Sequence, residues 1–367
     1  MPVLHKLSES EMTEMRKDFS GQIGIDTLCY YHNLTPKQKS KIMAAIKQLP
    51  NFKTIESDYA RDSYEYASDH LVSNGVKIHI FRKGGSTWGL FIIVHPTLVL
   101  GNDDRSALYQ LTKSSYNKMI KLVDRMLKPI HIPCSLDDMK LYRVDITVNA
   151  IFDNPAWVSE YIRILKKSMI LSHYKLDWFR EKDKKAKDCK LANRHSHKQY
   201  CKSAAFFVYD KTAQLEMIDH FPDALMGKKV LRLEAQLRRK TLKKWVHDKE
   251  LGSNWEIIKD VYKNRKRIIK WYLDRIQPAG RYVRYNDAVD LIKDAKLKEK
   301  TRTRMLYLLR KASDKESLTA ALKDLKAEYH LTGNQCGTVL KKFRKLGISP
   351  ITLPNSSELD ELPPIYF

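Results

Sequence analysis

Two short stretches of the chain alternate polar and apolar residues, and each contains an arginine two places before an acid. They read Arg-Val-Asp-Ile-Thr-Val-Asn at 143–149 and Leu-Arg-Leu-Glu-Ala-Gln-Leu-Arg at 231–238, and Phe-Phe-Val-Tyr-Asp-Lys lies between them at 206–211. Successive side chains of a β-strand point to opposite faces, so the polar residues of each stretch share one face. If the three strands pair in one sheet, carboxylates, guanidiniums and a phenol converge on one surface. That combination suits phosphoryl transfer on DNA.

The tyrosine, the lysine and the acids would divide this chemistry between them. Tyr209 is a candidate nucleophile if a metal ion, or a cation such as Lys211, lowers the cost of forming the phenolate. Asp145 and Glu234 on neighbouring strands are candidate ligands of one Mg²⁺ or Mn²⁺, because hard divalent ions prefer oxygen ligands. We therefore predict that Tyr209 and Lys211 are catalytic and that Asp145 and Glu234 bind the metal.

The basic residues are candidate phosphate ligands, since a guanidinium matches phosphate geometry bidentately. Those expected to contact phosphate or DNA are Arg143, Arg232, Arg238, Arg239, Lys263, Arg265, Lys266 and Arg267. Simpler interpretations fit the same patterns. An Arg-x-acid pattern on a strand also fits cross-strand ion pairs on a half-exposed sheet, without any role in catalysis. A tyrosine beside an aromatic strand also fits a packing residue whose hydroxyl contacts water.

The charge balance indicates a polyanionic partner. The chain has 367 residues, with 67 Lys+Arg against 43 Asp+Glu and a net charge of +24, and such a field attracts a phosphate backbone. DNA is the expected partner, a host helicase or polymerase and a homodimer are further candidates, and no apolar run is long enough to span a membrane. The residues 1–14 lack the apolar core of a signal peptide, and the five cysteines are few and scattered. Both features predict a location in the bacterial cytoplasm.

One cluster has ligand types that zinc accepts: Cys189, His195, His197 and Cys201. Its Cys-to-His spacing differs from that of common zinc fingers, so we interpret residues 177–202 as a solvated basic loop. The His-Ser-His sequence within it also differs from the His-hydrophobic-His strand of many DNA-nicking enzymes, because its middle residue is polar.

Hydrophobic periodicity predicts an α+β fold with an antiparallel sheet. Two rounds of strand, helix, hairpin and helix are expected, which suit either two related split-βαβ lobes or one large sheet with helices over one face. The segments that we expect are strands at 23–31, 76–81, 87–94, 141–150, 204–209 and 229–238, and helices at 35–49, 103–126 and 154–169. Beyond residue 240 only helices are expected, with a charged helical region at 242–276 and four shorter helices at 285–295, 300–312, 317–329 and 332–346.

These segments predict four parts. They are an N-terminal arm at 1–20, an α+β nicking domain at 21–240, a basic helical region at 241–354, and an acidic tail at 355–367. The helical region suits either a helix-turn-helix-like DNA-binding module or a helical bundle with solvated charges. The tail is expected to be disordered.

The ordered set of motifs resembles the rolling-circle replication initiators of phages and plasmids, of the filamentous-phage gene II type and the Rep-trans type. Residues 143–149, 209–211 and 231–238 look like that family's sequence of Arg-hydrophobic-Asp, Tyr-Asp-Lys and hydrophobic-Arg-hydrophobic-Glu. His-Pro-Thr-Leu-Val-Leu-Gly at 95–101 is similar to its Asn-Pro-x-x-Leu-Leu-Gly segment, and Leu-Gly-Ile-Ser-Pro at 346–350 to its Leu-Gly-Ile-Asn-Pro ending. His95 and Ser349 stand where the family often has Asn.

This resemblance covers residues 23 to 354 and implies a function. It implies an enzyme that nicks one strand at an origin through Tyr209 and a divalent metal, leaves a 3′-hydroxyl for the polymerase, and later rejoins the ends. Two other classes fit the residues: a sequence-specific DNA-binding regulator of replication or transcription without catalysis, and a metal-dependent nuclease in which water attacks.

Overall fold

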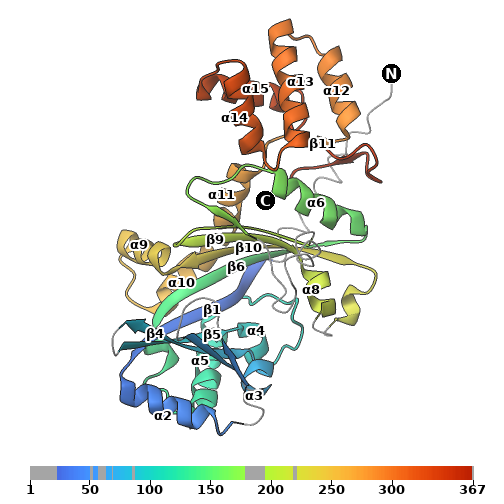
Figure 1. The fold of residues 1–367 in the computed structure, drawn as a ribbon. Helices are drawn as coiled ribbons and strands as arrows, with labels where there is room; N and C mark the ends of the chain where they lie inside the picture. Colours follow the sequence, from blue (N-terminus) through green and yellow to red (C-terminus); the bar gives the residue numbers. More distant parts are fainter. Residues whose placement is uncertain are drawn as a thin grey trace.

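Strands with alternating burial build the centre of the computed structural model (Figure 1), which describes residues 23–49, 53–56, 63–67, 69–84, 87–177, 195–217 and 221–365. The protein is α+β, and its described residues form one antiparallel sheet of ten strands in the order β2-β3-β4-β5-β1-β6-β10-β9-β8-β7. The strands are β1 (Ile23–Leu34), β2 (Lys53–Glu56), β3 (Ser63–Ala67), β4 (Val76–Gly84), β5 (Thr87–Val94), β6 (Lys140–Phe152), β7 (Lys175–Asp177), β8 (Ser196–Tyr200), β9 (Ala204–Asp210) and β10 (Lys229–Arg238).

The helices follow the strands in two rounds and then continue alone. They are α2 (Pro36–Ile46), α3 (Asp69–Ser73), α4 (Pro96–Val99), α5 (Lys113–Leu127), α6 (Pro155–Lys167), α8 (Lys211–Met217), α9 (Arg239–Lys249), α10 (Asn254–Lys263), α11 (Arg265–Ile276), α12 (Tyr285–Asp294), α13 (Glu299–Asp314), α14 (Leu318–Glu328) and α15 (Gly333–Lys345). The first round places its hairpin β4–β5 beside β1, and the second places β9–β10 beside β6. Because β1 pairs with β6, the two rounds form one continuous sheet.

One face of this sheet supplies the core. Ile92 of β5, Ile146 of β6 and Leu233 of β10 are fully buried on that face. Helices α2 and α5 cover it along the first round, and α11 covers it along the second, where the ring of Tyr272 stacks on Phe206 with centroids 4.7 Å apart. The polar residues alternate with these core residues and therefore lie on the opposite face, which is called the polar face below.

Two segments differ from the sequence prediction. The helix expected at 103–126 begins only at Lys113, where Thr112 forms a capping box, and Tyr109 instead pairs its backbone with Ile25. Residues 196–200, expected within a basic loop, form strand β8 and pair with β9. Pairing with β9 and the burial of several of their side chains make residues 196–200 a strand despite their polar composition.

The C-terminal helices α12–α15 form a separate cluster at one end of the molecule (Figure 1). By contrast, α9, α10 and α11 pack on the sheet, so the boundary expected at residue 240 separates β10 from helices that cover the same sheet. No helix among the described residues has the length and apolar character needed to cross a membrane.

The tail expected to be disordered is ordered over residues 355–365, so this prediction is wrong there. Its strand β12 (Glu361–Leu362) pairs with β11 (Tyr282–Val283), and Leu362 is fully buried. Glu361 accepts from Arg281 NH1 at 2.6 Å, and the Pro363 carbonyl accepts from the Tyr161 hydroxyl at 3.0 Å. The acidic Glu361 of the tail thus pairs with a basic residue of the preceding chain, and the apolar Leu362 is buried against it.

Candidate active site

Strand register brings the predicted residues together on the polar face. Across β9, β10 and β6, Tyr209 lies opposite Arg232, and Arg232 lies opposite Asn149. Glu234 is two residues along β10 from Arg232, and Asp145 lies opposite Gln236, so all of these side chains share one face. All of them except Asn149 line a cavity of about 370 Å³. The sequence prediction of Asp145, Glu234 and Tyr209 on one surface agrees with this arrangement.

A β-bulge adds an acid that the sequence analysis did not single out. The register of β1 against β6 shifts between Ile25 and Thr27, so Asp26 is the extra residue. A bulged residue leaves strict alternation, and both Asp26 and Thr27 line the cavity. The Thr27 hydroxyl donates to Asp26 Oδ2 at 2.9 Å. An Asp-Thr pair inside an apolar strand is the signal for this site. Alternation from the core residues Ile23 and Ile25 places Asp26 on the polar face, and the bulge brings Thr27 there as well.

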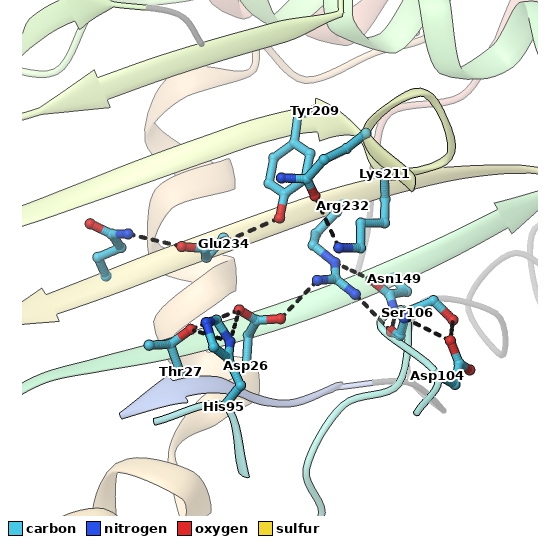
Figure 2. Close-up of polar contacts among 12 residues, drawn as sticks. Asp26, Thr27, His95, Asp104, Ser106, Asn149, Tyr209, Lys211, Arg232 and Glu234 are labelled. Atoms are coloured by element: carbon cyan, nitrogen blue, oxygen red, sulfur yellow. Dashed lines mark hydrogen bonds and ion pairs between the residues drawn. The ribbon is translucent and has the colours of Figure 1, made fainter. Parts of the chain in front are cut away.

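Asp26 pairs with an almost fully buried charge, the guanidinium of Arg232 (Figure 2). Arg232 is 1% exposed, and it donates to Asp26 Oδ1 at 2.8 Å, to Asn149 Oδ1 at 2.7 Å and to the Ser106 carbonyl at 2.7 Å. Burial alone would raise the pKa of Asp26, but Arg232, His95 and Lys211 together lower it to about 2. Each of the three nitrogens of Arg232 donates to a protein acceptor, which fixes the guanidinium in place and favours a positioning role. The expected contact of Arg232 with phosphate stays a prediction.

Tyr209 points its hydroxyl into the same cavity (Figure 2). The hydroxyl donates to Glu234 Oε2 at 3.4 Å, and Glu234 Oε1 accepts from Gln236 at 2.9 Å. Burial raises the pKa of Tyr209 well above its usual value, against the opposing charge of Arg232. Burial and the nearby Asp26 also raise the pKa of Glu234. Forming a phenolate here therefore requires a proton acceptor and added positive charge.

Lys211 enters the cavity from the junction of β9 and α8. The helix begins directly after Asp210, whose carboxylate accepts from the backbone N–H of Ala213 at 3.0 Å. Lys211 is 7% exposed, and its amine donates to Gln214 at 2.9 Å. Burial, with the positive charge of Arg232, lowers the pKa of Lys211 to about 7. A lysine with this pKa can take up or release a proton near neutrality.

Asp145 is a candidate metal ligand because one of its oxygens lacks a hydrogen bond. Arg143 Nε lies 3.1 Å from Asp145 Oδ1, yet the geometry is not that of a hydrogen bond, and among the described residues neither Asp145 Oδ1 nor the Thr147 hydroxyl has a hydrogen-bond partner. Burial raises the pKa of Asp145 well above its usual range; Arg143 opposes this shift and Glu234 adds to it. Added positive charge would relieve both carboxyls, and their oxygens suit Mg²⁺ or Mn²⁺. However, the described residues contain no group of three or more His, Cys, Asp or Glu side chains placed to hold a metal ion.

His95, which the sequence analysis left without a role, lies beside Asp26. Its Nδ1 is 3.3 Å from the Thr27 hydroxyl and 3.9 Å from Asp26 Oδ2. Burial lowers the pKa of His95 despite the nearby Asp26. The cavity also contains two cations that the motifs do not include, Lys77 and Arg105. Arg143, whose side chain is 26% exposed, lines the same cavity and remains a candidate phosphate ligand.

The other predicted DNA contacts lie outside this cavity. Arg238 donates to Gln236 and to the Cys201 carbonyl, and Arg239 lies over the ring of Tyr31 at 5.7 Å. The four basic residues at the α10–α11 junction are on helices that cover the core face. They are Lys263, Arg265, Lys266 and Arg267, of which Arg265 covers the Tyr262 ring and Arg267 lines a different cavity.

The possible zinc cluster cannot be assembled from the described residues, because Cys189 lies outside them. His197 is buried on β8, and burial together with Lys166 lowers its pKa to about 4. The Cys201 sulfur contacts the Ser203 hydroxyl at 3.2 Å.

Comparison of the chain with protein-family models and with curated proteins gave no match.

Proposed function

We propose that this protein is a DNA strand transferase that nicks one strand at a replication origin and rejoins it through a covalent bond to Tyr209. One observation carries the proposal: a tyrosine hydroxyl, three carboxyls and a lysine with a pKa of about 7 line one cavity of a strongly basic protein. Hydrolysis of DNA by water does not require the buried tyrosine as nucleophile, and DNA binding without catalysis does not require the carboxyls.

In the proposed step, the Tyr209 oxygen attacks the phosphorus of the scissile phosphodiester. The bond from phosphorus to the 3′ oxygen breaks, the phosphate stays on Tyr209 as a 5′-phosphotyrosyl ester, and the 3′ oxygen takes a proton from solvent water and leaves as a hydroxyl. The neutral Lys211 amine accepts the tyrosine proton. When a 3′-hydroxyl attacks the ester and the strand is rejoined, that hydroxyl releases its proton to water and the Lys211 ammonium returns the stored proton to the leaving Tyr209 oxygen. One phosphate ester replaces another, so the step needs no external energy.

The remaining side chains neutralise the phosphate and position the reacting groups. Arg143 neutralises the phosphate, since its guanidinium is partly exposed in the cavity. Asp26 holds Arg232 beside Tyr209, which keeps one positive charge near the phenol without using it on the phosphate. Asp145 and Glu234 would hold Mg²⁺ or Mn²⁺, which supplies further positive charge for the phosphate oxygens when it is bound.

Origin recognition is assigned, within the same proposal, to the helices α12–α15. The last turn of α15 contains Lys342, Arg344 and Lys345, and such a basic helix suits a DNA groove or its phosphates. The similar order of the two strand-and-helix rounds fits the expectation of two related split-βαβ units joined at β1 and β6.

The test uses supercoiled plasmid that carries the cognate origin, with Mg²⁺ or Mn²⁺ present. Wild type, Tyr209→Phe and Glu234→Ala are compared for nicking and for protein covalently attached to DNA. We expect an adduct from wild type and none from Tyr209→Phe. Nicking that survives Tyr209→Phe would favour hydrolysis, and binding without cleavage under either metal would favour the regulator.

A further inference from the structure

Five aromatic rings form a continuous cluster on the polar face beside the cavity. They are called the aromatic platform and are Tyr31 of β1, His79 and Phe81 of β4, Phe91 of β5 and Tyr142 of β6. Phe81 and Phe91 are stacked with centroids 4.9 Å apart and planes at 17°, and Tyr142 meets Phe91 edge-on at 4.6 Å. Tyr31 and His79 lie 5.4 and 5.9 Å from Phe91.

The platform is separate from the core. Its neighbours along the same strands, Ile80 and Ile92, are fully buried beneath α2 and α5, whereas Phe81, Phe91 and Tyr142 are partly exposed on the opposite face. The Phe81 ring lies across Gly89 of β5, where an added Cβ would come within 2.3 Å of the ring. A glycine at this position leaves room for the ring to lie against the sheet, with part of it open to a partner.

The platform continues the site in space. Tyr31 is four residues along β1 from Thr27 in the cavity, which is about 13 Å of extended strand. His79 is two residues along β4 from Lys77, which also lines the cavity, and Tyr142 adjoins Arg143. A polymer chain that occupies the cavity can therefore reach the platform without leaving the polar face.

Cations border these rings. Arg239 covers the Tyr31 ring at 5.7 Å, and Lys77, two residues before His79 on β4, lines the adjoining cavity. Aromatic faces bordered by cations match one ligand chemistry well: unpaired bases for the rings and a phosphate backbone for the charges. Bases within a duplex are stacked on one another and offer no faces to such a surface.

We propose that the aromatic platform binds the unpaired bases of single-stranded DNA next to the scissile phosphate. The platform thereby makes the site selective for a melted strand over a duplex. This inference rests on the proposed function for its ligand, DNA, and deepens it by specifying the form of DNA that enters the site. It does not depend on strand cleavage.

The experiment measures equilibrium binding of a fluorescent single-stranded oligonucleotide and of the matching duplex. The protein is Tyr209→Phe, so that no covalent adduct contributes, and Phe81→Leu and Phe91→Leu are introduced into it separately. Leucine keeps apolar volume and removes the stacking face. Trp271→Ala is the matched control, because Trp271 is 42% exposed with Arg275 over its ring, but it lies on α11 across the sheet.

We expect each platform variant to bind single strands about tenfold more weakly, because loss of one base–aromatic stacking contact typically weakens binding by about that factor. Duplex binding and the slope of affinity against salt should stay unchanged, because no phosphate contact is removed. The control should bind both forms as its parent does. Single-strand affinity that stays within twofold of the parent in both platform variants would overturn the inference.

A second measurement covers the case in which the leucine variants fold poorly. Wild type is photo-cross-linked to a single strand containing 5-iodouracil, and the modified peptides are identified by mass spectrometry. Cross-links at platform residues support the inference, and cross-links confined to other regions overturn it. Failure of the proposed function is separately visible, since it removes the Tyr209 adduct and leaves these binding and cross-linking results unaffected.

Discussion

Replacing Asp26 with asparagine removes the charged partner of the almost fully buried Arg232. Arg232 is 1% exposed, and its NH1 lies 2.8 Å from Asp26 Oδ1. Burial would raise the pKa of Asp26, but Arg232, His95 and Lys211 outweigh it and lower the pKa from 3.8 to about 2. The Asp26 side chain is only 18% exposed, so solvent screens this interaction weakly.

The size of the effect follows from that shift. A depression of roughly two pKa units corresponds to about 2.5 kcal/mol of stability. Loss of one partner from a buried ion pair costs about 3–5 kcal/mol, because the other charge is left uncompensated. We expect Asp26→Asn to lower the free energy of unfolding by about 3 kcal/mol at pH 7. The folded pKa is the lower one, so this contribution is complete above about pH 4 and is lost as the pH falls towards 2.

The assay is urea-induced unfolding of wild type, Asp26→Asn, Arg232→Met and the double variant at pH 7 and pH 3. The double variant should be more stable than the sum of the single effects predicts, since it leaves no lone buried charge. Asp274→Asn is the control, because Asp274 is 54% exposed in its pair with Lys270 and should cost less than about 1 kcal/mol. A loss below 1 kcal/mol for Asp26→Asn at pH 7, or one of equal size at pH 3, would refute the reasoning.

Three other predictions concern different parts of the molecule. Because the pKa of Lys211 is about 7, the rate of adduct formation should rise about tenfold per pH unit below 7 and level off above it, and Lys211→Met should lack this inflection in a pH–rate profile. Burial, together with the charge of Lys166, lowers the pKa of His197 from 6.5 to about 4. Between these pH values the unfolded chain binds a proton at His197 that the folded protein does not, so acidification from pH 6.5 to 4 should cost about 3 kcal/mol of folding stability. Urea unfolding of His197→Leu over the same pH range should lack this loss of about 3 kcal/mol. Leu362→Ala should lower the free energy of unfolding by about 3 kcal/mol, measured by denaturation, because Leu362 is fully buried, whereas a disordered tail would give no change.

Alternation along the strands predicted much of the sheet. The stretches around Asp145 and Glu234 have period-two patterns, and the apolar run before Tyr209 has strand character; the structure pairs β6, β10 and β9 with those three side chains on one face. Strand β8 was missed because its residues are polar and lie in a basic segment, and only the adjacent β9 gives them a reason to be extended. Local composition carries no information about such a neighbour.

The site was less predictable where it depends on one irregular residue or on burial. The bulge at Asp26 places Thr27 on the same face as Asp26, which strict alternation does not predict. Arg232 has the residue type of a phosphate ligand, but its neighbours Asp26 and Asn149 come from other strands, and they turn it into a buried positioning residue. In the tail, acidic composition suggested disorder, while the buried Leu362 and the Arg281 partner of Glu361 decided the outcome.

The attachment of DNA to Tyr209 tests the central claim most directly. Wild type is incubated with end-labelled single-stranded origin DNA and Mg²⁺ or Mn²⁺, the denatured protein is separated from free DNA, and the labelled peptide is identified by mass spectrometry. Tyr200→Phe, a change to a partly exposed tyrosine on the adjacent strand β8, is the matched control. The proposed function predicts a nucleotide bound through phosphate to Tyr209 in wild type and in Tyr200→Phe. Cleavage with no bound nucleotide, or a nucleotide bound to any other residue, would contradict it.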